Sequence, residues 1–221
     1  MKTHISPNFN DRTEGTPLDW VILHYTDVPT VEEALALLTS PQSQVSAHYL
    51  VDEDGEVYAL VDEAYRAWHA GVGYWRGKTD LNSHTIGIEI QNPGHSHGYR
   101  AFPEAQLKSV LNLCKDIQRR HTLGCDCVWG HSDIAPARKQ DPGHLFPWER
   151  FAKEGLGIWP GEALSFETDP LQLLQAIGYD PAYPPESVIA FQRHFRPTQI
   201  DGQLDLETIA LLRKVAYACG V

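Results

Sequence analysis

The stretch Trp20-Val21-Ile22-Leu23-His24 is a short apolar run with turn-forming residues on both sides and a histidine at its end. A run of this length is typical of a strand that is buried inside a sheet. Thr30 and Glu33 follow as a capping box, which predicts a helix that ends at Ser40-Pro41. A buried strand followed by a helix indicates a layered α/β fold.

Two further segments add strands to this sheet. Residues 46–52 and 56–61 flank the turn Glu53-Asp54-Gly55, and this arrangement predicts an antiparallel hairpin. Residues 86–90 carry isoleucine at every second position, so Glu89 is expected on the face opposite the isoleucines. Together these strands predict a mixed sheet.

A longer helix is predicted to begin at Pro103. Its apolar residues recur at helical spacing and form one stripe: Leu107, Val110, Leu111, Cys114 and Ile117. The stretch Val128-Trp129-Gly130-His131 then predicts another short strand that ends in histidine. Two predicted strands therefore end in histidine, and strand ends are places where ligands and catalytic groups are often presented.

The pattern changes near residues 155–165, where glycine and proline indicate a connection between two parts of the chain. Three short amphipathic helices are predicted beyond it. They are marked by Asp169-Pro170, by Val188, Phe191 and Phe195, and by Asp205. We expect these helices to bury one small core of their own. The sequence thus predicts an α/β domain at residues 1–160 and a small all-α domain at residues 166–221.

Composition excludes several classes of protein. The 221 residues are 42% hydrophobic and 21% charged, which is ordinary for a globular chain with a sizeable core. Because 18 Lys and Arg face 29 Asp and Glu, the net charge of −11 has the wrong sign for a nucleic-acid partner. No apolar run approaches the ~18 residues of a membrane-spanning helix. The four cysteines form no C-x-x-C pair, so we expect buried or bystander thiols.

The segment from His131 to Gly143 carries the most chemistry. An extended Lys139-Gln140-Asp141 would point Lys139 and Asp141 to the same side. A catalytic zinc needs three nitrogen or oxygen ligands and one open position, and His24, His131 and Asp141 would supply such a set. Spacing alone leaves open whether the two histidines are ligands or hydrogen-bonded structural residues.

Five separated strings in residues 18–160 resemble the zinc-dependent N-acetylmuramoyl-L-alanine amidases of the bacterial AmpD/AmiD group. In chain order they are Val21-Ile22-Leu23-His24-Tyr25-Thr26, Val45-Ser46-Ala47-His48-Tyr49, Arg66-Ala67-Trp68-His69-Ala70-Gly71, Ile86-Gly87-Ile88-Glu89 and residues 131–143. The resemblance implies a mixed sheet flanked by helices, and it makes residues 1–160 a zinc amidase catalytic domain.

The resemblance also implies the residues of the site. It assigns one Zn²⁺ per chain to His24, His131 and Asp141, and it assigns the catalytic roles to Glu89 and Lys139. Glu89 would accept a proton from water and Lys139 would stabilise the oxyanion, although the residues leave open how the two share these roles.

The same resemblance gives substrate-binding roles to four more residues: His48, Trp68, His69 and Asn82. Packing is the alternative role for Trp68 and His69. His48 shares a strand face with Leu50, where a hydrogen-bonded structural histidine is the alternative.

The C-terminal part has a resemblance of its own. Phe191-Gln192-Arg193, Ile200-Asp201-Gly202 and Glu207-Thr208 resemble the three-helix peptidoglycan-binding domain that is attached to AmiD-type amidases. This makes residues 166–221 a peptidoglycan-binding-like helical domain. The alternative is a helical cap that stabilises the catalytic domain.

The expected activity is hydrolysis of the amide between the lactyl group of N-acetylmuramic acid, or its anhydro form, and L-alanine. Peptidoglycan and muropeptides are the expected partners, in cell-wall degradation or recycling, while the sequence defines no oligomeric state. The alternatives are a non-catalytic peptidoglycan-recognition protein and a zinc hydrolase of a different amide. A wall-binding domain favours the periplasm, whereas the start Met1–Pro7 lacks the apolar stretch of a signal peptide, which favours the cytoplasm. We expect the periplasm.

Overall fold

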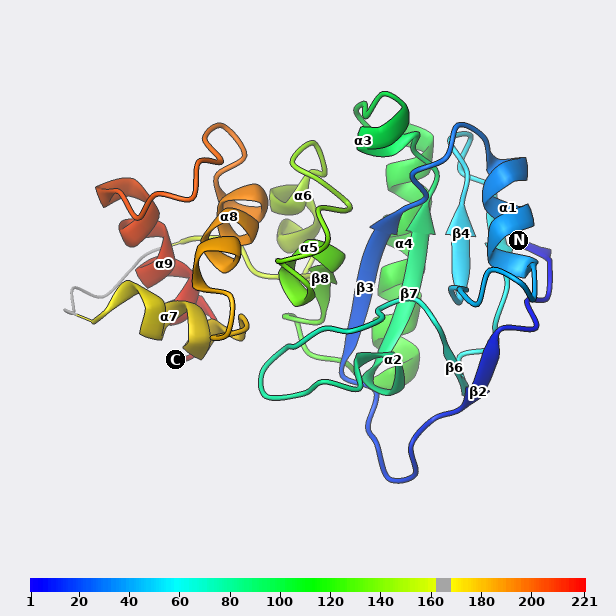
Figure 1. The fold of residues 1–221 in the computed structure, drawn as a ribbon, viewed down its shortest axis with the longest axis horizontal. Helices are drawn as coiled ribbons and strands as arrows, with labels where there is room; N and C mark the ends of the chain where they lie inside the picture. The colour runs from blue at the N-terminus through cyan, green and yellow to red at the C-terminus, as the bar shows by residue number, and fades with distance from the viewer. Residues whose placement is uncertain (162–167) are drawn as a thin grey trace.

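A six-stranded mixed sheet forms the centre of the molecule in the computed structural model, which describes residues 1–161 and 168–221 (Figure 1). The strand order is β1-β5-β4-β7-β3-β8. These strands are β1 (Lys2–Thr3), β5 (Val57–Ala59), β4 (Tyr49–Val51), β7 (Thr85–Ile90), β3 (Trp20–Tyr25) and β8 (Val128–Gly130). β4 and β5 pair antiparallel, whereas β3 is parallel to both β7 and β8. The predicted mixed sheet and hairpin are confirmed.

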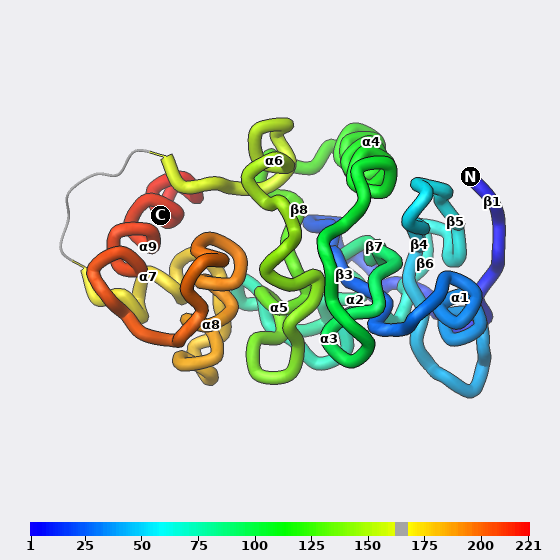
Figure 2. Tube along the Cα trace, turned by 90° about the horizontal axis from the view of Figure 1, so that it is seen from above, coloured from blue at the N-terminus to red at the C-terminus, as the bar shows by residue number. Residues whose placement is uncertain are grey.

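Helices lie on both sides of this sheet. Six of them are α1 (Val31–Thr39), α2 (Leu81–His84), α3 (Gly94–His97), α4 (Glu104–His121), α5 (His131–Ile134) and α6 (Trp148–Lys153). Figure 2 shows α4 on one side of the sheet and α5 on the other. α1 begins where it was predicted, because the Thr30 side chain accepts a hydrogen bond from the Glu33 N–H. A small antiparallel pair, β2 (Phe9–Asp11) and β6 (Tyr65–Ala67), lies apart from the main sheet.

One predicted strand ends earlier than expected. β8 stops at Gly130, and His131 is the first residue of α5 rather than the last residue of a strand. The Asp133 side chain accepts a hydrogen bond from the Gly130 N–H at 2.8 Å, and this contact turns the chain out of the sheet into the helix.

The two faces of the sheet differ in what they bury. On one face, alternate residues of β3 and β7 share an apolar cluster with α4, and this cluster includes Val21, Leu23, Ile86, Ile88 and Ile117. On the other face Ile22 stands beside Gly87, and His24 stands beside Glu89. The predicted separation of Glu89 from the isoleucines is therefore confirmed.

The three C-terminal helices are α7 (Pro170–Ile177), α8 (Pro184–Phe195) and α9 (Leu206–Ala218), and Asp169 caps α7 as predicted. The predicted separate core of these helices was wrong. Their apolar residues form one cluster with Ile22 and Trp129 of the sheet, on the face that α4 leaves uncovered. The expected domain boundary, between residues 160 and 166, falls mostly outside the described residues.

A buried carboxylate joins these helices to α5. Asp133 accepts hydrogen bonds from the Tyr179 hydroxyl at 2.7 Å and from His194 Nδ1 at 2.8 Å. His194 also stacks on the ring of Trp148, with centroids 3.9 Å apart. Contacts between α7–α9 and the remainder of the chain are therefore both apolar and polar. Among the described residues, none of the helices has both the length and the apolar composition needed to cross a bilayer.

Candidate metal centre and active-site cleft

Three buried side chains converge at the carboxyl end of the sheet. His24 Nδ1 lies 2.8 Å from His131 Nδ1 and 3.1 Å from Asp141 Oδ2, and the last two atoms are 3.0 Å apart. Within residues 1–161 and 168–221, this is the one group of histidine, cysteine and carboxylate side chains that converges closely enough to hold a metal ion.

The fold explains why residues so far apart in the sequence meet. β3 runs one residue past its predicted end, to Tyr25, so His24 is its second-last residue. His131 directly follows β8, which is parallel to β3, so both histidines lie at the same edge of the sheet. The loop that carries Asp141 is held by two hydrogen bonds. The Asp141 carbonyl accepts from the Ser132 N–H at 2.8 Å, and the Tyr99 hydroxyl donates to the Pro142 carbonyl at 2.8 Å.

The protonation states suit metal binding. Burial, together with the nearby His131, lowers the pKa of His24 to about 4, so this imidazole is neutral near pH 7. Burial alone would raise the pKa of Asp141, but its interactions with His131 and His24 hold that pKa well below its usual value. Two imidazole nitrogens and one carboxylate oxygen form a donor set that zinc accepts in catalytic sites.

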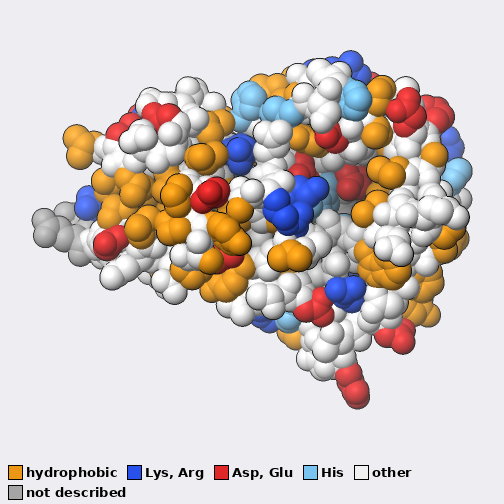
Figure 3. Space-filling view, viewed as in Figure 1, with side chains coloured by type: hydrophobic (Ala, Val, Ile, Leu, Met, Phe, Trp, Pro, Cys, Tyr) orange, Lys and Arg blue, Asp and Glu red, His pale blue; other side chains and the backbone are white. Residues whose placement is uncertain are grey.

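A cavity of about 310 Å³ opens over His24, His131 and Asp141. Figure 3 shows a hollow in this face of the molecule, with acidic side chains inside it and a patch of basic side chains on its edge. Seven of the predicted site residues line this cavity: His24, Trp68, His69, Glu89, His131, Lys139 and Asp141. The cavity is large enough to receive part of a small-molecule or peptide ligand.

Glu89 has the character of an acid–base group. Its Oε2 atom is buried and has no hydrogen-bond partner among the described residues. Burial raises the pKa of Glu89 well above its usual value, nearby Asp141 raises it further, and Lys139 lowers it. A buried carboxyl group with a raised pKa, next to a candidate metal site, is suited to proton transfer.

The structure places two predicted substrate-binding residues beneath the cavity rather than on its wall. His48 is fully buried, and its Nδ1 accepts a hydrogen bond from the Gly87 N–H at 2.9 Å. The Asn82 side-chain oxygen accepts hydrogen bonds from the N–H groups of His69 and Ala70, at 3.1 and 2.8 Å. Contact of His48 and Asn82 with a substrate stays a prediction.

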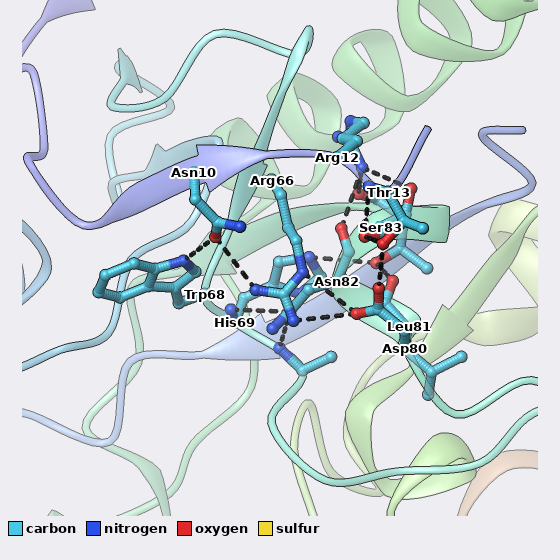
Figure 4. A network of polar contacts seen from close by, with 12 residues as sticks. Asn10, Arg12, Thr13, Arg66, Trp68, His69, Asp80, Leu81, Asn82 and Ser83 are labelled. Carbon is cyan, nitrogen blue, oxygen red and sulfur yellow. Dashed lines mark hydrogen bonds and ion pairs between the residues drawn. The ribbon is translucent and has the colours of Figure 1, made fainter. Parts of the chain in front are cut away.

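Sequence reasoning did not find Arg12, which supports this part of the site. Figure 4 shows its side chain among the polar residues around Asn82. Arg12 Nη1 donates to the carbonyl oxygens of Asn82 and Ser83, each at 2.9 Å, and to that of Thr85 at 3.1 Å. No local pattern marks an arginine whose partners are backbone carbonyls 70 residues away.

Sequence reasoning also missed several residues on the cavity wall. Leu37 and Val45 bring apolar surface from α1 and the segment after it, and Arg138 and Gln140 flank Lys139. Leu37 and Val45 are 43% and 38% exposed, and Leu37 lies off the buried side of α1, which is a signal for a binding surface.

Known proteins with similar sequences identify the family to which this chain is related. The Amidase_2 family, described as N-acetylmuramoyl-L-alanine amidase, matches residues 14–144. The chain is 39% identical over 222 residues to N-acetylmuramoyl-L-alanine amidase AmiD of Escherichia coli (strain K12), covering 86% of this chain and 79% of that protein. It is 31% identical over 164 residues to 1,6-anhydro-N-acetylmuramyl-L-alanine amidase AmpD of Haemophilus influenzae, covering 66% of this chain and 87% of that protein.

Solved structures agree with the sequence matches. The crystal structure of AmpDh3 from Pseudomonas aeruginosa superposes with a TM-score of 0.83 at 31% identity, covering 98% of this chain and 99% of that chain. The complex of E. coli AmiD with anhydro-N-acetylmuramic acid-L-Ala-D-gamma-Glu-L-Lys superposes with a TM-score of 0.79 at 35% identity, covering 94% of this chain and 92% of that chain. The chain therefore belongs to the N-acetylmuramoyl-L-alanine amidase family.

Proposed function

We propose that this chain is a zinc-dependent amidase that cleaves the bond between the lactyl group of N-acetylmuramic acid, or its anhydro form, and L-alanine. The observation that carries the proposal is the convergence of His24, His131 and Asp141 under a cavity that Glu89 and Lys139 also line. The anhydromuropeptide in the AmiD complex supports this class of substrate.

The donor set supports one zinc ion per chain. His24 Nδ1, His131 Nδ1 and Asp141 Oδ2 would hold it and leave a position open towards the cavity. A bound zinc ion polarises a carbonyl group and lowers the pKa of water towards ~7.

The chain's own groups complete the reaction. Glu89 accepts a proton from the attacking water while the water oxygen bonds to the lactyl carbonyl carbon. Glu89 then gives this proton to the alanine nitrogen as the carbon–nitrogen bond breaks. The Lys139 ammonium, on the cavity wall, stabilises the negative charge that develops on the carbonyl oxygen. Trp68 and His69 offer contact surface to the substrate from the same wall.

For the two parts of the chain, we propose a zinc amidase catalytic domain at residues 1–160 and a peptidoglycan-binding-like helical domain at residues 166–221. Binding of the helices to the wall would raise the local concentration of the cavity near an insoluble polymer. Peptidoglycan and muropeptides are then the partners, and the periplasm is the proposed compartment. Fractionation of cells that express the native gene tests the compartment, and a purely cytosolic signal would refute it.

One experiment tests the activity. The zinc-loaded chain is incubated with purified muropeptides, and the products are identified by mass. We expect a free stem peptide and a peptide-free muramic acid, loss of both products after strong chelation, and their return with added zinc. A zinc-loaded chain that binds muropeptides without cleaving them would indicate a recognition protein. Cleavage of another amide bond would indicate a different hydrolase, and cleavage that chelation leaves unchanged would refute the zinc mechanism.

A further inference from the structure

His69 lies between a metal ligand and the neighbouring strand. It is 8% exposed, and its Nδ1 lies 3.0 Å from His24 Nε2, the ring nitrogen of His24 that faces away from the metal site. On the other side, His69 Nε2 lies 3.1 Å from the Thr85 hydroxyl oxygen. The rings of His24 and His69 meet edge to face, with centroids 5.1 Å apart. Both ring nitrogens of His69 are therefore engaged inside the protein.

The direction of each hydrogen bond can be assigned from the far end. The Thr85 hydroxyl donates its only hydrogen to the Leu81 carbonyl at 2.7 Å, so it can only accept from His69 Nε2. His69 then carries its hydrogen on Nε2, and its bare Nδ1 accepts from His24 Nε2–H. This leaves His24 Nδ1 bare and directed at His131 and Asp141, which is the state that a metal ligand requires.

The two histidines of the proposed metal site differ in their outer hydrogen-bond partners, because His24 Nε2 faces the His69 ring. The other ligand is supported differently, because His131 Nε2 lies 3.0 Å from the Ala70 carbonyl oxygen, a backbone acceptor. Asn82 fixes the N–H groups of both His69 and Ala70, so one side chain holds the segment that supports both ligands (Figure 4).

Gly87 gives independent evidence that the His69 ring must occupy this position. A Cβ atom at position 87 would lie 2.3 Å from His69 Cγ and 2.6 Å from His69 Nδ1, distances that atoms cannot adopt. The backbone of Gly87 does not have a positive φ angle. Glycine is thus needed here for space rather than for backbone conformation, and the space is filled by His69.

We propose that His69 is a positioning residue that fixes the tautomer and ring orientation of His24. Residue 87 is glycine in this proposal because any side chain there would occupy the space of the His69 ring. The inference rests on the metal site of the proposed function. Removal of such an outer hydrogen-bond partner weakens metal binding by ~10- to 100-fold in other proteins. A residue that only touched substrate would leave the metal affinity unchanged.

The first test compares His69→Ala with His69→Gln in the full chain. Zinc dissociation constants are measured by competition with a chelator, and the visible absorption spectrum of the cobalt-loaded protein reports ligand geometry. We expect His69→Ala to weaken zinc binding by ~10- to 100-fold and to shift the cobalt spectrum. His69→Gln should recover most of both, because the Gln oxygen can accept from His24 Nε2–H. An unchanged dissociation constant in His69→Ala overturns the proposal, as does a Gln variant no better than Ala.

The second test uses Gly87→Ala, alone and combined with His69→Ala. We expect Gly87→Ala alone to weaken zinc binding, and to add little in the His69→Ala background, where the smaller side chain leaves room. Losses that simply add would refute the link between the two positions. Gly161→Ala is the matched control, since Gly161 has no positive φ and none of the described residues has an atom within 4 Å of its Cβ position. The zinc binding of this variant should equal that of the parent chain.

These readouts are separate from hydrolysis. A chain that shows the expected zinc affinities but cleaves no muropeptide would refute the proposed function and leave the role of His69 standing. A chain that cleaves muropeptides while its zinc affinity ignores His69 would do the reverse. A parent chain that binds no metal would overturn both.

Discussion

The two faces of the central sheet are built from alternate residues of the same strands and are about equally buried, yet they do different work. Val21, Leu23 and Ile88 pack beneath α4 in a purely apolar cluster. His24 and Glu89, one position along, face a cavity together with buried polar groups. Burial alone therefore does not identify the functional face. The functional face is distinguished by polar atoms that have specific hydrogen-bond partners. The apolar face requires only side chains whose volumes fill the space between the sheet and α4.

The largest expected effect separates the faces directly. His24→Ala should abolish stoichiometric zinc binding and hydrolysis, because two ligands without the third hold zinc poorly. Leu23→Ala, on the opposite face, should lower the free energy of unfolding by ~2 to 5 kcal/mol and leave the zinc content at one per chain. Metal analysis and urea unfolding of both variants check this. Full zinc retention by His24→Ala would refute its assignment as a ligand.

Glu89→Gln should show that the polar face divides further into metal ligands and proton-transfer groups. The substitution keeps size and removes the base, so we expect hydrolysis to fall by ~10²-fold or more with zinc content unchanged. Turnover of muropeptides under saturating zinc is the measurement. Glu53→Gln changes a partly exposed carboxylate that is paired with Arg100, and this control should keep parental turnover. Near-normal turnover by Glu89→Gln would exclude the proposed role.

Acid should destabilise the polar face through His48. Burial lowers the pKa of His48 to about 3, below its ordinary value of 6.5, so the folded state favours the neutral ring. The stabilisation is complete above pH ~6.5 and is lost as the pH falls towards 3, since only the unfolded chain then binds the proton. Between pH 7 and 4.5, the parent chain should lose ~2 to 3 kcal/mol more than His48→Asn. Equal pH dependence of the two chains in urea unfolding would contradict this.

The smallest expected effect concerns the contact between α5 and the C-terminal helices. Tyr179→Phe removes the hydroxyl that donates to Asp133 and leaves a buried carboxylate oxygen without that donor. We expect a loss of ~1 to 3 kcal/mol in the free energy of unfolding, with zinc content and soluble-muropeptide cleavage retained. Thermal unfolding measures it. Tyr183→Phe, at an exposed tyrosine, is the control and should leave the melting temperature unchanged.

The apolar face could be predicted from the sequence because the patterns that define it lie within short, continuous segments. Isoleucine at every second position in residues 86–90 predicts a strand with one apolar face. Apolar residues at helical spacing from Leu107 to Ile117 predict a helix with one apolar stripe. The candidate ligand set was predicted by resemblance, since spacing alone left His24 and His131 open to a structural role. The fold brings these two residues together with Asp141.

The rest depends on contacts between distant segments. The residues around His69 predicted a role in substrate binding by resemblance. Its hydrogen-bond partners His24 and Thr85 are distant in the sequence and are set only by the fold. Arg12 had no signal in the sequence, and Asn82 was predicted only as a substrate-binding residue, because the contacts of both with backbone atoms are set by the fold. The C-terminal helices were predicted correctly as helices, yet an amphipathic stripe does not say which surface it will cover.

The apolar cluster that α7–α9 share with Ile22 and Trp129 affects the order in which the chain can fold as it is made. A ribosome adds roughly 5–20 residues per second, so the sheet and the three proposed metal ligands emerge seconds before α9 is complete. During that interval, the side of Trp129 and Ile22 that these helices cover is open to water. Nascent chains that stall before α7 therefore expose an apolar surface that favours aggregation, and the later synthesis of α7–α9 covers it.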